Sequence, residues 1–486
     1  MNQHVPSLLV VVPLMGAFLT FLAGLYRGRQ ASLAVVLMVL TGNLSLAASL
    51  FGQVGNLPLR YVVGGWEAPY GIELVVDRLS ILMLALIAVV ALLSAVHSVA
   101  MVAQDIDHKA PAFYALFLLL VTALNGICVT GDAFNLYVML EISSLATYGL
   151  IALGGGRAFL ATFHYIIMGT IGASFYLLGV GYLYIKTGTL NMADLAARLP
   201  AVFDSPSAKV GLALMVVGVL LKMALFPLHA WLPNAYTYAP DATSTLVAPL
   251  STKVSVYIMI RMTSTIFGRD NVFTLTSFSD VIVILASIGI VAGSCFALAQ
   301  RDLKKTLSYI IVAEAGYMVG GIWLNSSRAF AGAVFHILND ALVTLGLFMV
   351  AGSLMYYFEA RNLKEMPNFF KEMTPTSLAF FVLAMSVVGM PPTSGFFSKF
   401  YLVGGALEKG HPEFALALLF ASLANAFVFL RIFERAHYHP VEIAPRRAMP
   451  ATMTLATLLV ALAVVGLGMS SGMVYSQFIF PFTGWP

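Results

Sequence analysis

Six ionisable side chains lie within long apolar stretches of the sequence, and all six are of types that can carry or stabilise a proton. They are Glu141, Lys222, Lys253, Glu314, Asp340 and Lys399. A charge inside an apolar segment is costly and by default marks an ion pathway or a proton relay. The alternative for any one of them is an interhelical ion pair, or a long side chain that reaches a polar surface. Six in one chain favour the relay.

A buried lysine next to a carboxylate can hold or release a proton. Desolvation disfavours the ammonium and a nearby carboxylate favours it, so movement of the partner switches the lysine between the two states. Glu141 and Lys222 lie two apolar segments apart and are expected to pair. Lys253 is then the next proton carrier, and Lys399 the carrier on the far side.

His229, His336 and Asp340 are the candidate relay groups, since histidine titrates near neutral pH. Each histidine taken alone is equally a candidate for a neutral, hydrogen-bonded packing residue, and His229 and His336 rank above His164 and His97. Asp340 follows His336 by four residues, so both lie on one face if this segment is helical. Three interpretations are open for them: a relay pair, part of a hydrated cation site with Na+ near Asp340, or a local ion pair without a transport role.

Composition places these residues in a membrane. Of the 486 residues, 60% are hydrophobic and 10% are charged, whereas soluble domains carry about 25% charged residues. This excludes a water-soluble protein and also a disordered one. A net charge of +4 over this length also excludes a basic stripe for nucleic acid.

The apolar stretches are long enough for membrane-spanning helices and too long for barrel strands. We therefore predict an all-α integral membrane protein with about 14 transmembrane helices, and short connections leave no room for an inserted soluble domain. The first segment is interpreted as a helix rather than a signal peptide, because it lacks a basic leading region. The expected spans are 7–25, 31–51, 74–101, 111–129, 133–153, 160–185, 208–238, 242–267, 279–299, 305–323, 329–356, 376–406, 412–434 and 450–478.

The distribution of basic residues predicts the orientation. With these spans, fourteen Lys and Arg residues fall on the side opposite the termini and eight on the side of the termini. Since cytoplasmic connections are enriched in Lys and Arg, both termini are expected on the non-cytoplasmic side of the cell (inner) membrane.

The chain is expected to bind no cofactor itself. Cys128 and Cys295 both lie in apolar runs, and no Cys-x-x-Cys motif exists. Ligands for haem c, an iron–sulfur cluster or structural zinc are therefore missing from the sequence, and any redox centre would belong to a partner.

A repeat relates the polar landmarks of the middle of the chain. Glu141 pairs with Glu314, His164 with His336, Lys222 with Lys399, and Lys253 with Arg431, at separations of 172 to 178 residues. Each copy would contain five spans, and an odd number inverts the second copy, as in secondary transporters. The predicted domains are helices 1–3 (1–110), the first repeat (111–267), the inverted second repeat (279–434) and a C-terminal helix (435–486).

Prolines interrupt the two spans that carry the paired lysines. Pro227 and Pro233 follow Lys222, and Pro391 and Pro392 precede Lys399. Proline removes a backbone donor and frees carbonyls that polar groups or water must satisfy. Two broken helices beside lysines are therefore expected, although a simple kink is the alternative.

These residues resemble a known family. The segment from Lys222 to Lys253 contains Phe-Pro-Leu-His-Ala-Trp-Leu-Pro-Asn-Ala and Ala-Pro-Asp-Ala-Thr-Ser, which is similar to the signature of the proton-conducting antiporter-like family. This family includes the D and A subunits of multisubunit Na+/H+ antiporters, the large membrane-arm subunits of respiratory complex I, and relatives in membrane-bound hydrogenases. The segments beginning at Thr130 and Tyr184 look most similar to the D-type antiporter protein.

The resemblance implies a 14-helix subunit with two inverted five-helix units and a hydrated axis. It assigns proton transfer to Glu141, Lys222, Lys253 and Lys399, with other membrane subunits and the lipid bilayer as partners. The main hypothesis is a Na+/H+ antiporter D-type subunit. The alternatives are a proton-pumping membrane-arm subunit of a complex I-like quinone oxidoreductase or a membrane-bound hydrogenase, and a structural anchor without transport.

Three positions depart from the family pattern. Tyr236 stands where many members have histidine in the broken helix. Asp340 replaces an expected histidine, and Thr344 an expected lysine. These departures affect the central relay.

Overall fold

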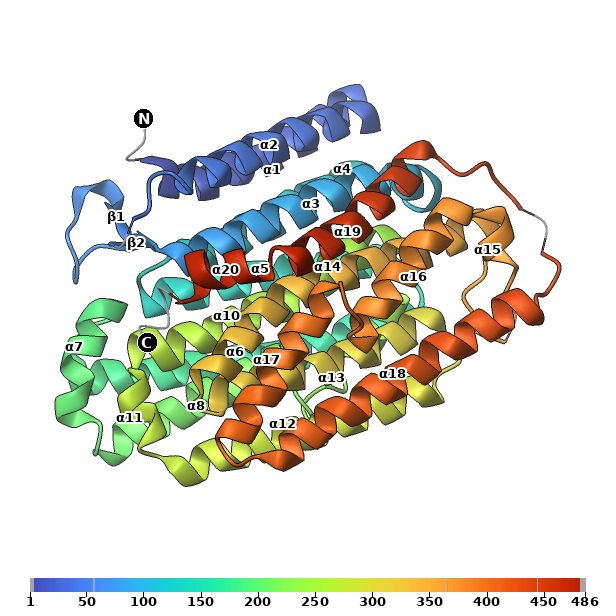
Figure 1. The fold of residues 1–486 in the computed structure, drawn as a ribbon. Coiled ribbons are helices and arrows are strands. Elements are labelled where there is room, and N and C mark those ends of the chain that lie inside the picture. Colours follow the sequence, from blue (N-terminus) through green and yellow to red (C-terminus); the bar gives the residue numbers. More distant parts are fainter. Residues whose placement is uncertain (1–3, 56, 365, 444, 481–486) are drawn as a thin grey trace. The chain divides into compact units, whose positions relative to one another are not determined.

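The computed structural model describes residues 4–55, 57–364, 366–443 and 445–480, and most of them are helical (Figure 1). Eleven helices of this described part are long and apolar enough to cross a membrane. The prediction of an all-α membrane protein is confirmed, with one short β-hairpin added. The predicted number of spans and the inverted repeat stay predictions.

The chain divides into two compact units that alternate along the sequence. The first comprises the described residues up to Leu92, with His108–Met223 and Ser251–Ser277. The second comprises Leu93–Asp107, Ala224–Leu250 and the described residues from Phe278 onward. The helices α3 (Arg78–Asp105) and α10 (Asp241–Ile260) continue from one unit into the other, and the first two residues of α12 (Thr276–Ala299) also belong to the first unit.

The first unit is built on helix pairs. α1 and α2 lie side by side, α4 packs on α1 and α5, and α6 packs on α5 and α8 (Figure 1). Gly172 of α6 and Gly218 of α8 lie so close to the partner helix that an added Cβ would meet backbone atoms. The helices of this unit besides the parts of α3 and α10 are α1 (Val5–Arg27), α2 (Arg29–Leu50), α4 (Ala110–Val129), α5 (Ala133–Ala152), α6 (Arg157–Thr187), α7 (Met192–Val202), α8 (Pro206–Lys222) and α11 (Arg269–Phe273), with a π-helical turn at Arg261–Ile266.

A two-stranded antiparallel hairpin lies in the expected connection 52–73 and extends past its end. β1 (Leu59–Val62) pairs with β2 (Glu73–Val76), with Leu59 opposite Val76. The predicted span 74–101 therefore begins too early, since the helix begins at Arg78. Buried Glu73 holds β2 in place by accepting from Arg60 and from Asn191, which caps α7.

The second unit surrounds α14, which is buried along most of its length. α13, α16, α17 and α19 all pack against it. The remaining helices are α9 (Leu232–Tyr238), α12 (Thr276–Ala299), α13 (Leu303–Trp323), α14 (Ser327–Phe358), α15 (Phe369–Glu372), α16 (Thr374–Val388), α17 (Ser394–Glu408), α18 (Pro412–Tyr438), α19 (Ala451–Met469) and α20 (Ser471–Val474), with a π-helical turn at Tyr475–Ile479.

Two interruptions occur where the prolines predict them. α8 ends at Lys222 and the next helix begins at Leu232, and α16 ends at Val388 before α17 begins at Ser394. Gly389 ends α16 in the left-handed conformation, with φ of 91°, which glycine adopts without steric cost. Each break therefore lies directly beside one of the predicted lysines or within a few residues of it.

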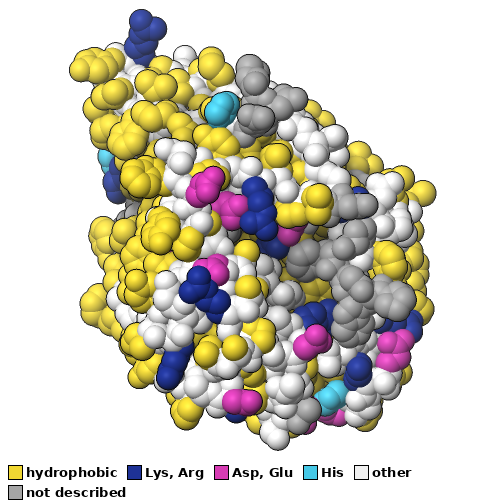
Figure 2. Space-filling model, turned by 90° about the vertical axis from the view of Figure 1, so that its left-hand side faces the viewer, with side chains coloured by type: hydrophobic (Ala, Val, Ile, Leu, Met, Phe, Trp, Pro, Cys, Tyr) yellow, Lys and Arg dark blue, Asp and Glu magenta, His cyan; other side chains and the backbone are white. Residues whose placement is uncertain are grey.

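The surface fits a lipid environment. In Figure 2, hydrophobic side chains cover wide areas and charged side chains lie between them. Large apolar side chains such as Phe18, Leu160 and Leu416 are more than half exposed. Such contiguous apolar surface is stable in lipid and unstable in water.

Candidate functional site

The structure brings Lys222 and Glu141 together, as predicted. Lys222 is the last residue of α8, and its Nζ lies 3.3 Å from Glu141 Oε1 of α5. It also donates to Ser144 Oγ at 2.7 Å. Glu141 and Ser144 are three residues apart on α5 and face the same way. The lysine side chain is 4% exposed and the carboxylate 26%, so a buried ammonium meets a more accessible carboxylate.

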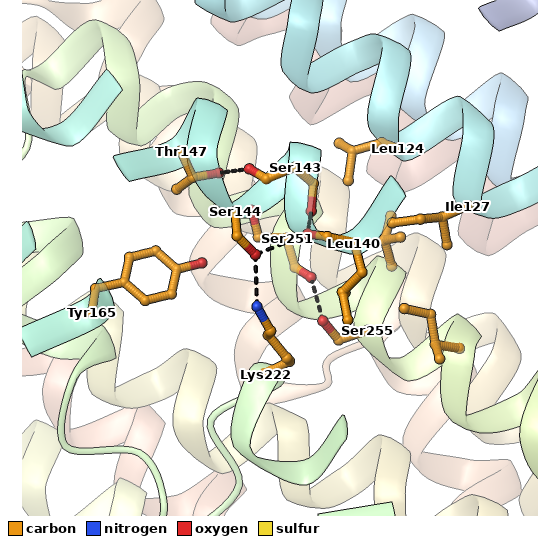
Figure 3. A pocket seen from close by; sticks show the side chains of 12 residues that line it. Leu124, Ile127, Leu140, Ser143, Ser144, Thr147, Tyr165, Lys222, Ser251 and Ser255 are labelled. Carbon is orange, nitrogen blue, oxygen red and sulfur yellow. Dashed lines mark hydrogen bonds between the residues drawn. The ribbon is translucent and has the colours of Figure 1, made fainter. Parts of the chain in front are cut away.

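A small polar cavity adjoins Lys222 (Figure 3). Its volume is about 20 Å³, which is room for one water molecule. Hydroxyl groups of Ser144 on α5 and of Ser251 and Ser255 on α10 line it together with apolar side chains. Ser255 Oγ donates to the carbonyl of Ser251, one turn earlier. The cavity thus lies between Lys222 and the helix that carries Lys253.

Lys253 is fully buried in the part of α10 that belongs to the first unit. Tyr257 and Arg261 follow it at intervals of four residues, so the three lie on one helix face. The structure places Lys253 on the same helix as the cavity-lining serines, two residues from each of them along the chain.

Lys399 lies in a different environment, in the second unit. Its Nζ donates to the carbonyls of Val387 and Val388 at 2.6 and 3.2 Å and to Ser422 Oγ at 2.9 Å. The carbonyls at a helix end lack intrahelical partners and carry partial negative charge. The ammonium is therefore held by the C-terminal end of α16, on the break itself.

Polar residues of α14 contact both sides of this second break. Asn339 Oδ1 accepts from Ser386 of α16 at 2.9 Å and from Ser394 of α17 at 2.7 Å. His336 Nδ1 lies 2.9 Å from Ser398 Oγ, next to Lys399 in the chain. The ring of His336 also lies 5.1 Å from that of Tyr317. His336 is thus buried beside the lysine helix.

Asp340 is fully buried on α14 and accepts from Thr344 Oγ1 at 2.7 Å. The two departures from the family pattern in this helix are therefore hydrogen-bonded to each other. The third departure, Tyr236, is fully buried in α9, with its ring edge-to-face on Trp231. In the part of the chain that the structure describes, no three His, Cys, Asp or Glu side chains cluster as a metal site would, and Na+ near Asp340 stays a prediction.

His229 lies in the first break, among aromatic rings. It stacks on Phe226 and Phe296, with centroids 5.2 and 5.9 Å apart, and meets the edge of Tyr309. The two histidines that rank lower as relay candidates lie in different environments. His164 is exposed, whereas His97 is buried and lies 3.2 Å from Ser353 Oγ. Glu314 is buried in α13, one turn before Tyr317.

A buried ion pair in the second unit is not predicted from the sequence. Lys304 Nζ lies 2.8 Å from Asp241 Oδ1, and both side chains are less than a tenth exposed. Lys304 also donates to the carbonyl of Ala239, where α9 ends. It thus clamps the corner that leads into α10. In the sequence Lys304 stands at the edge of an apolar run and is therefore counted as a connection residue. The position of Asp241 after Ala-Pro is the sequence signal that could have indicated the ion pair.

Comparison with known proteins agrees with this architecture. Residues 130–424 match the family described as NADH:quinone oxidoreductase/Mrp antiporter, transmembrane. The chain is 42% identical to the N subunit of the NADH-quinone oxidoreductase of Desulforudis audaxviator, over 99% of its length and 98% of the relative. It is 33% identical to the D subunit of the Na(+)/H(+) antiporter of Alkalihalophilus pseudofirmus, covering 90% of this chain and 87% of that one.

The fold is also found among solved structures. A chain of the Mrp complex from Dietzia sp. DQ12-45-1b superposes with a TM-score of 0.89 at 24% identity, over 99% of this chain and 97% of that one. The match to the family covers more than half of the chain and includes Glu141, Lys222, Lys253 and Lys399. The chain belongs to the NADH:quinone oxidoreductase/Mrp antiporter transmembrane family.

Proposed function

We propose that this chain is a proton-translocating, antiporter-like membrane subunit of a multisubunit complex, of the Na+/H+ antiporter D type. The observation that carries the proposal is the buried Lys222–Glu141 pair at the end of an interrupted helix, beside a cavity with room for one water molecule. Similarity over nearly the full length to a protein named as the D component of a Na(+)/H(+) antiporter supports it.

The proposed mechanism begins with the charge of Lys222. With Glu141 at 3.3 Å the ammonium is favoured, and withdrawal of the carboxylate leaves a buried charge that favours proton release. Glu141 is the more exposed partner, so it is the group with freedom to move. A water in the cavity, with Ser144 and Ser255 as neighbours, is placed to receive the proton.

Lys253 then carries the proton in the same unit, and Lys399 in the second. His229, His336 and Asp340 are the proposed relay groups, and inverted five-helix repeats are the proposed symmetry that relates the two lysines at helix breaks. Lys399, held by the carbonyls of α16, has the geometry of a proton-exchange site at such a break.

The test is transport by the reconstituted complex. Lys222→Met should lower proton-coupled transport about 1,000-fold, as expected on removal of a proton-transfer group, while assembly is retained. Lys186→Met is the matched control, because Lys186 is exposed at the end of α6. Transport at the control's level in an assembled Lys222→Met complex would contradict the proposal.

A second candidate function is a proton-pumping membrane-arm subunit of a quinone oxidoreductase. The 42% identity to a protein named as the N component of an NADH-quinone oxidoreductase favours it. Composition of the purified native complex separates the two: small membrane subunits alone support the antiporter, and subunits that carry flavin or iron–sulfur clusters support the redox complex.

Orientation is part of the proposal. Both termini are proposed on the non-cytoplasmic side of the cell membrane, from the excess of basic residues in the opposite connections. A cysteine introduced at position 4 should react with a membrane-impermeant thiol reagent in intact spheroplasts, and one introduced at position 29 should react only after lysis.

A further inference from the structure

The strongest unassigned feature of the first unit is a buried network around Arg261. The guanidinium contacts Asp77 through two parallel bonds, from Nη1 to Oδ2 and from Nη2 to Oδ1, each of 2.6 Å. Nη2 also donates to Ser80 Oγ at 2.8 Å, and Nε donates to Tyr257 Oη at 2.8 Å. A bidentate arginine–carboxylate pair is both strong and fixed in direction.

This network continues the face of α10 that carries Lys253. Arg261 is two turns beyond Lys253, about 12 Å along the axis at about 1.5 Å per residue. Tyr257 lies midway on the same face. From its sequence position, Arg261 is counted among the connection residues. In the structure it is buried, and a π-helical turn begins at this residue.

The network also lies at the boundary of the apolar helices. Asp77 stands between β2 and the first residue of α3, and its side chain is 24% exposed against 10% for Arg261. Its carboxylate also accepts the backbone N–H of Ser80, so it caps α3. On this face, the pair therefore lies beyond Tyr257, towards the hairpin end of the unit.

The groups of this network are poor proton conductors. Arginine stays protonated in proteins and offers no acceptor. Tyr257 Oη donates its proton to the carbonyl of Cys128 at 2.8 Å, which is no onward carrier. Asp77 offsets part of the positive charge of Arg261, but the guanidinium is the more buried partner and stays protonated, so it disfavours a second cation beside it, as arginines do in selective pores.

We propose that the Arg261–Asp77 pair is an electrostatic barrier that closes the hairpin end of the Lys253 face of α10 to protons and Na+. The barrier rests on the proposed function, since it prevents dissipation of a gradient only if Lys253 carries protons. It restricts proton exchange with Lys253 to the routes that do not pass Arg261.

The experiment measures passive proton uptake into liposomes that contain the whole complex, with an imposed pH difference and a trapped pH-sensitive dye. Arg261→Gln should raise the leak about tenfold or more, because a unit charge next to the path is lost. Arg261→Lys keeps the charge but loses the bidentate contact with Asp77, so its leak should lie between those of wild type and Arg261→Gln. A leak at wild-type level in assembled Arg261→Gln would overturn the proposal.

A second variant keeps the test decisive if Arg261→Gln fails to assemble. The double variant Asp77→Asn with Arg261→Gln leaves no unpaired buried charge, so it avoids the penalty of a broken ion pair. It should also leak, whereas Asp77→Asn alone keeps the cation and should not. The proposal would be overturned if the double variant showed passive proton uptake at the wild-type level, or if Asp77→Asn alone raised it.

The leak separates this inference from the proposed function. Lys222→Met should lose coupled transport without a rise in passive uptake, whereas Arg261→Gln should gain passive uptake. If Lys222→Met transports normally, the proposed function fails. If Lys222→Met is inactive and Arg261→Gln stays tight, only the barrier fails.

Discussion

The lysines at the two helix breaks are held by different kinds of partner. In the first unit, Lys222 faces a side-chain carboxylate and a hydroxyl, Glu141 and Ser144. In the second unit, Lys399 donates to two backbone carbonyls and the hydroxyl of Ser422, and the carboxylate of Glu314 acts on it electrostatically. A carboxylate can rotate away or be protonated, whereas carbonyls at a helix end move only with the helix. In the proposed mechanism, a side chain therefore switches the first site, and movement of the helix end switches the second.

The largest expected effect tests this contrast directly. Glu141→Gln should lower coupled transport about 1,000-fold, since the group that favours the Lys222 ammonium is lost. Ser422→Ala, which removes the hydroxyl partner of Lys399, should cost about tenfold or less because the carbonyls remain. Initial transport rates in proteoliposomes measure both, with Glu67→Gln, an exposed residue, as control. Equal losses would show that the two lysines are switched alike.

Lys304 sharpens the comparison, because both members of its ion pair with Asp241 are buried. Asp241→Asn leaves Lys304 buried without its counter-charge and should destabilise the folded chain by about 3 kcal/mol. Thermal unfolding in detergent measures this loss. The exposed Asp204, paired with Lys209 at 3.2 Å, provides Asp204→Asn, expected to change the free energy of unfolding by less than about 1 kcal/mol. A small effect of Asp241→Asn would group Lys304 with Lys222, whose carboxylate partner is proposed to move.

Ser144→Ala examines how far the hydroxyl, rather than the carboxylate, positions Lys222. Loss of one hydrogen bond to a charged group costs about 1.5 kcal/mol, or about tenfold in rate. The neighbour Ser143 also lines the cavity and, like Ser144, donates to the carbonyl of Leu140, but it is Ser144 that accepts from Lys222. Ser143→Ala should therefore stay within about twofold of wild type. A Ser144→Ala loss as large as that of Glu141→Gln would assign the switch to the serine.

The smallest expected effect is on the backbone holder of Lys399. Gly389→Ala forces a side chain into a left-handed residue, at a cost of about 1 kcal/mol, and its Cβ would lie 3.0 Å from Lys399 Cδ. Transport should fall about fivefold. Gly466→Ala in α19 is the control, because nothing lies within 4 Å of its added Cβ. Unchanged transport in Gly389→Ala would mean that the end of α16 does not position the lysine.

The sequence predicts the membrane class, the two helix breaks and the Glu141–Lys222 pairing, because each depends on a local signal: apolar length, proline, or a charge in an apolar run. The Lys304–Asp241 and Arg261–Asp77 pairs are not predicted from the sequence. These four residues stand at the edges of apolar segments, where a charge is usually solvated. Their burial depends on which helix ends meet in three dimensions, and no single-segment pattern contains that information.

The β-hairpin is not predicted from the sequence, for a related reason. Its strands have only four residues each, too short for alternation to stand out beside a long apolar helix. What holds β2 is the contact of Glu73 with Asn191, 118 residues away. A short strand is thus defined here by a distant helix cap.

Asn339 ties together the two helices that meet at the second break. One amide oxygen ties Ser386 before the break to Ser394 after it, and Ser386 Oγ in turn accepts from the backbone N–H of Gly395. Separating α16 from α17 must disrupt these bonds together, so opening is cooperative and rare compared with rotation of the Glu141 side chain. Amide hydrogen exchange at Gly395 should accordingly be slow, and the second break should set the pace of any cycle in which both lysines take part.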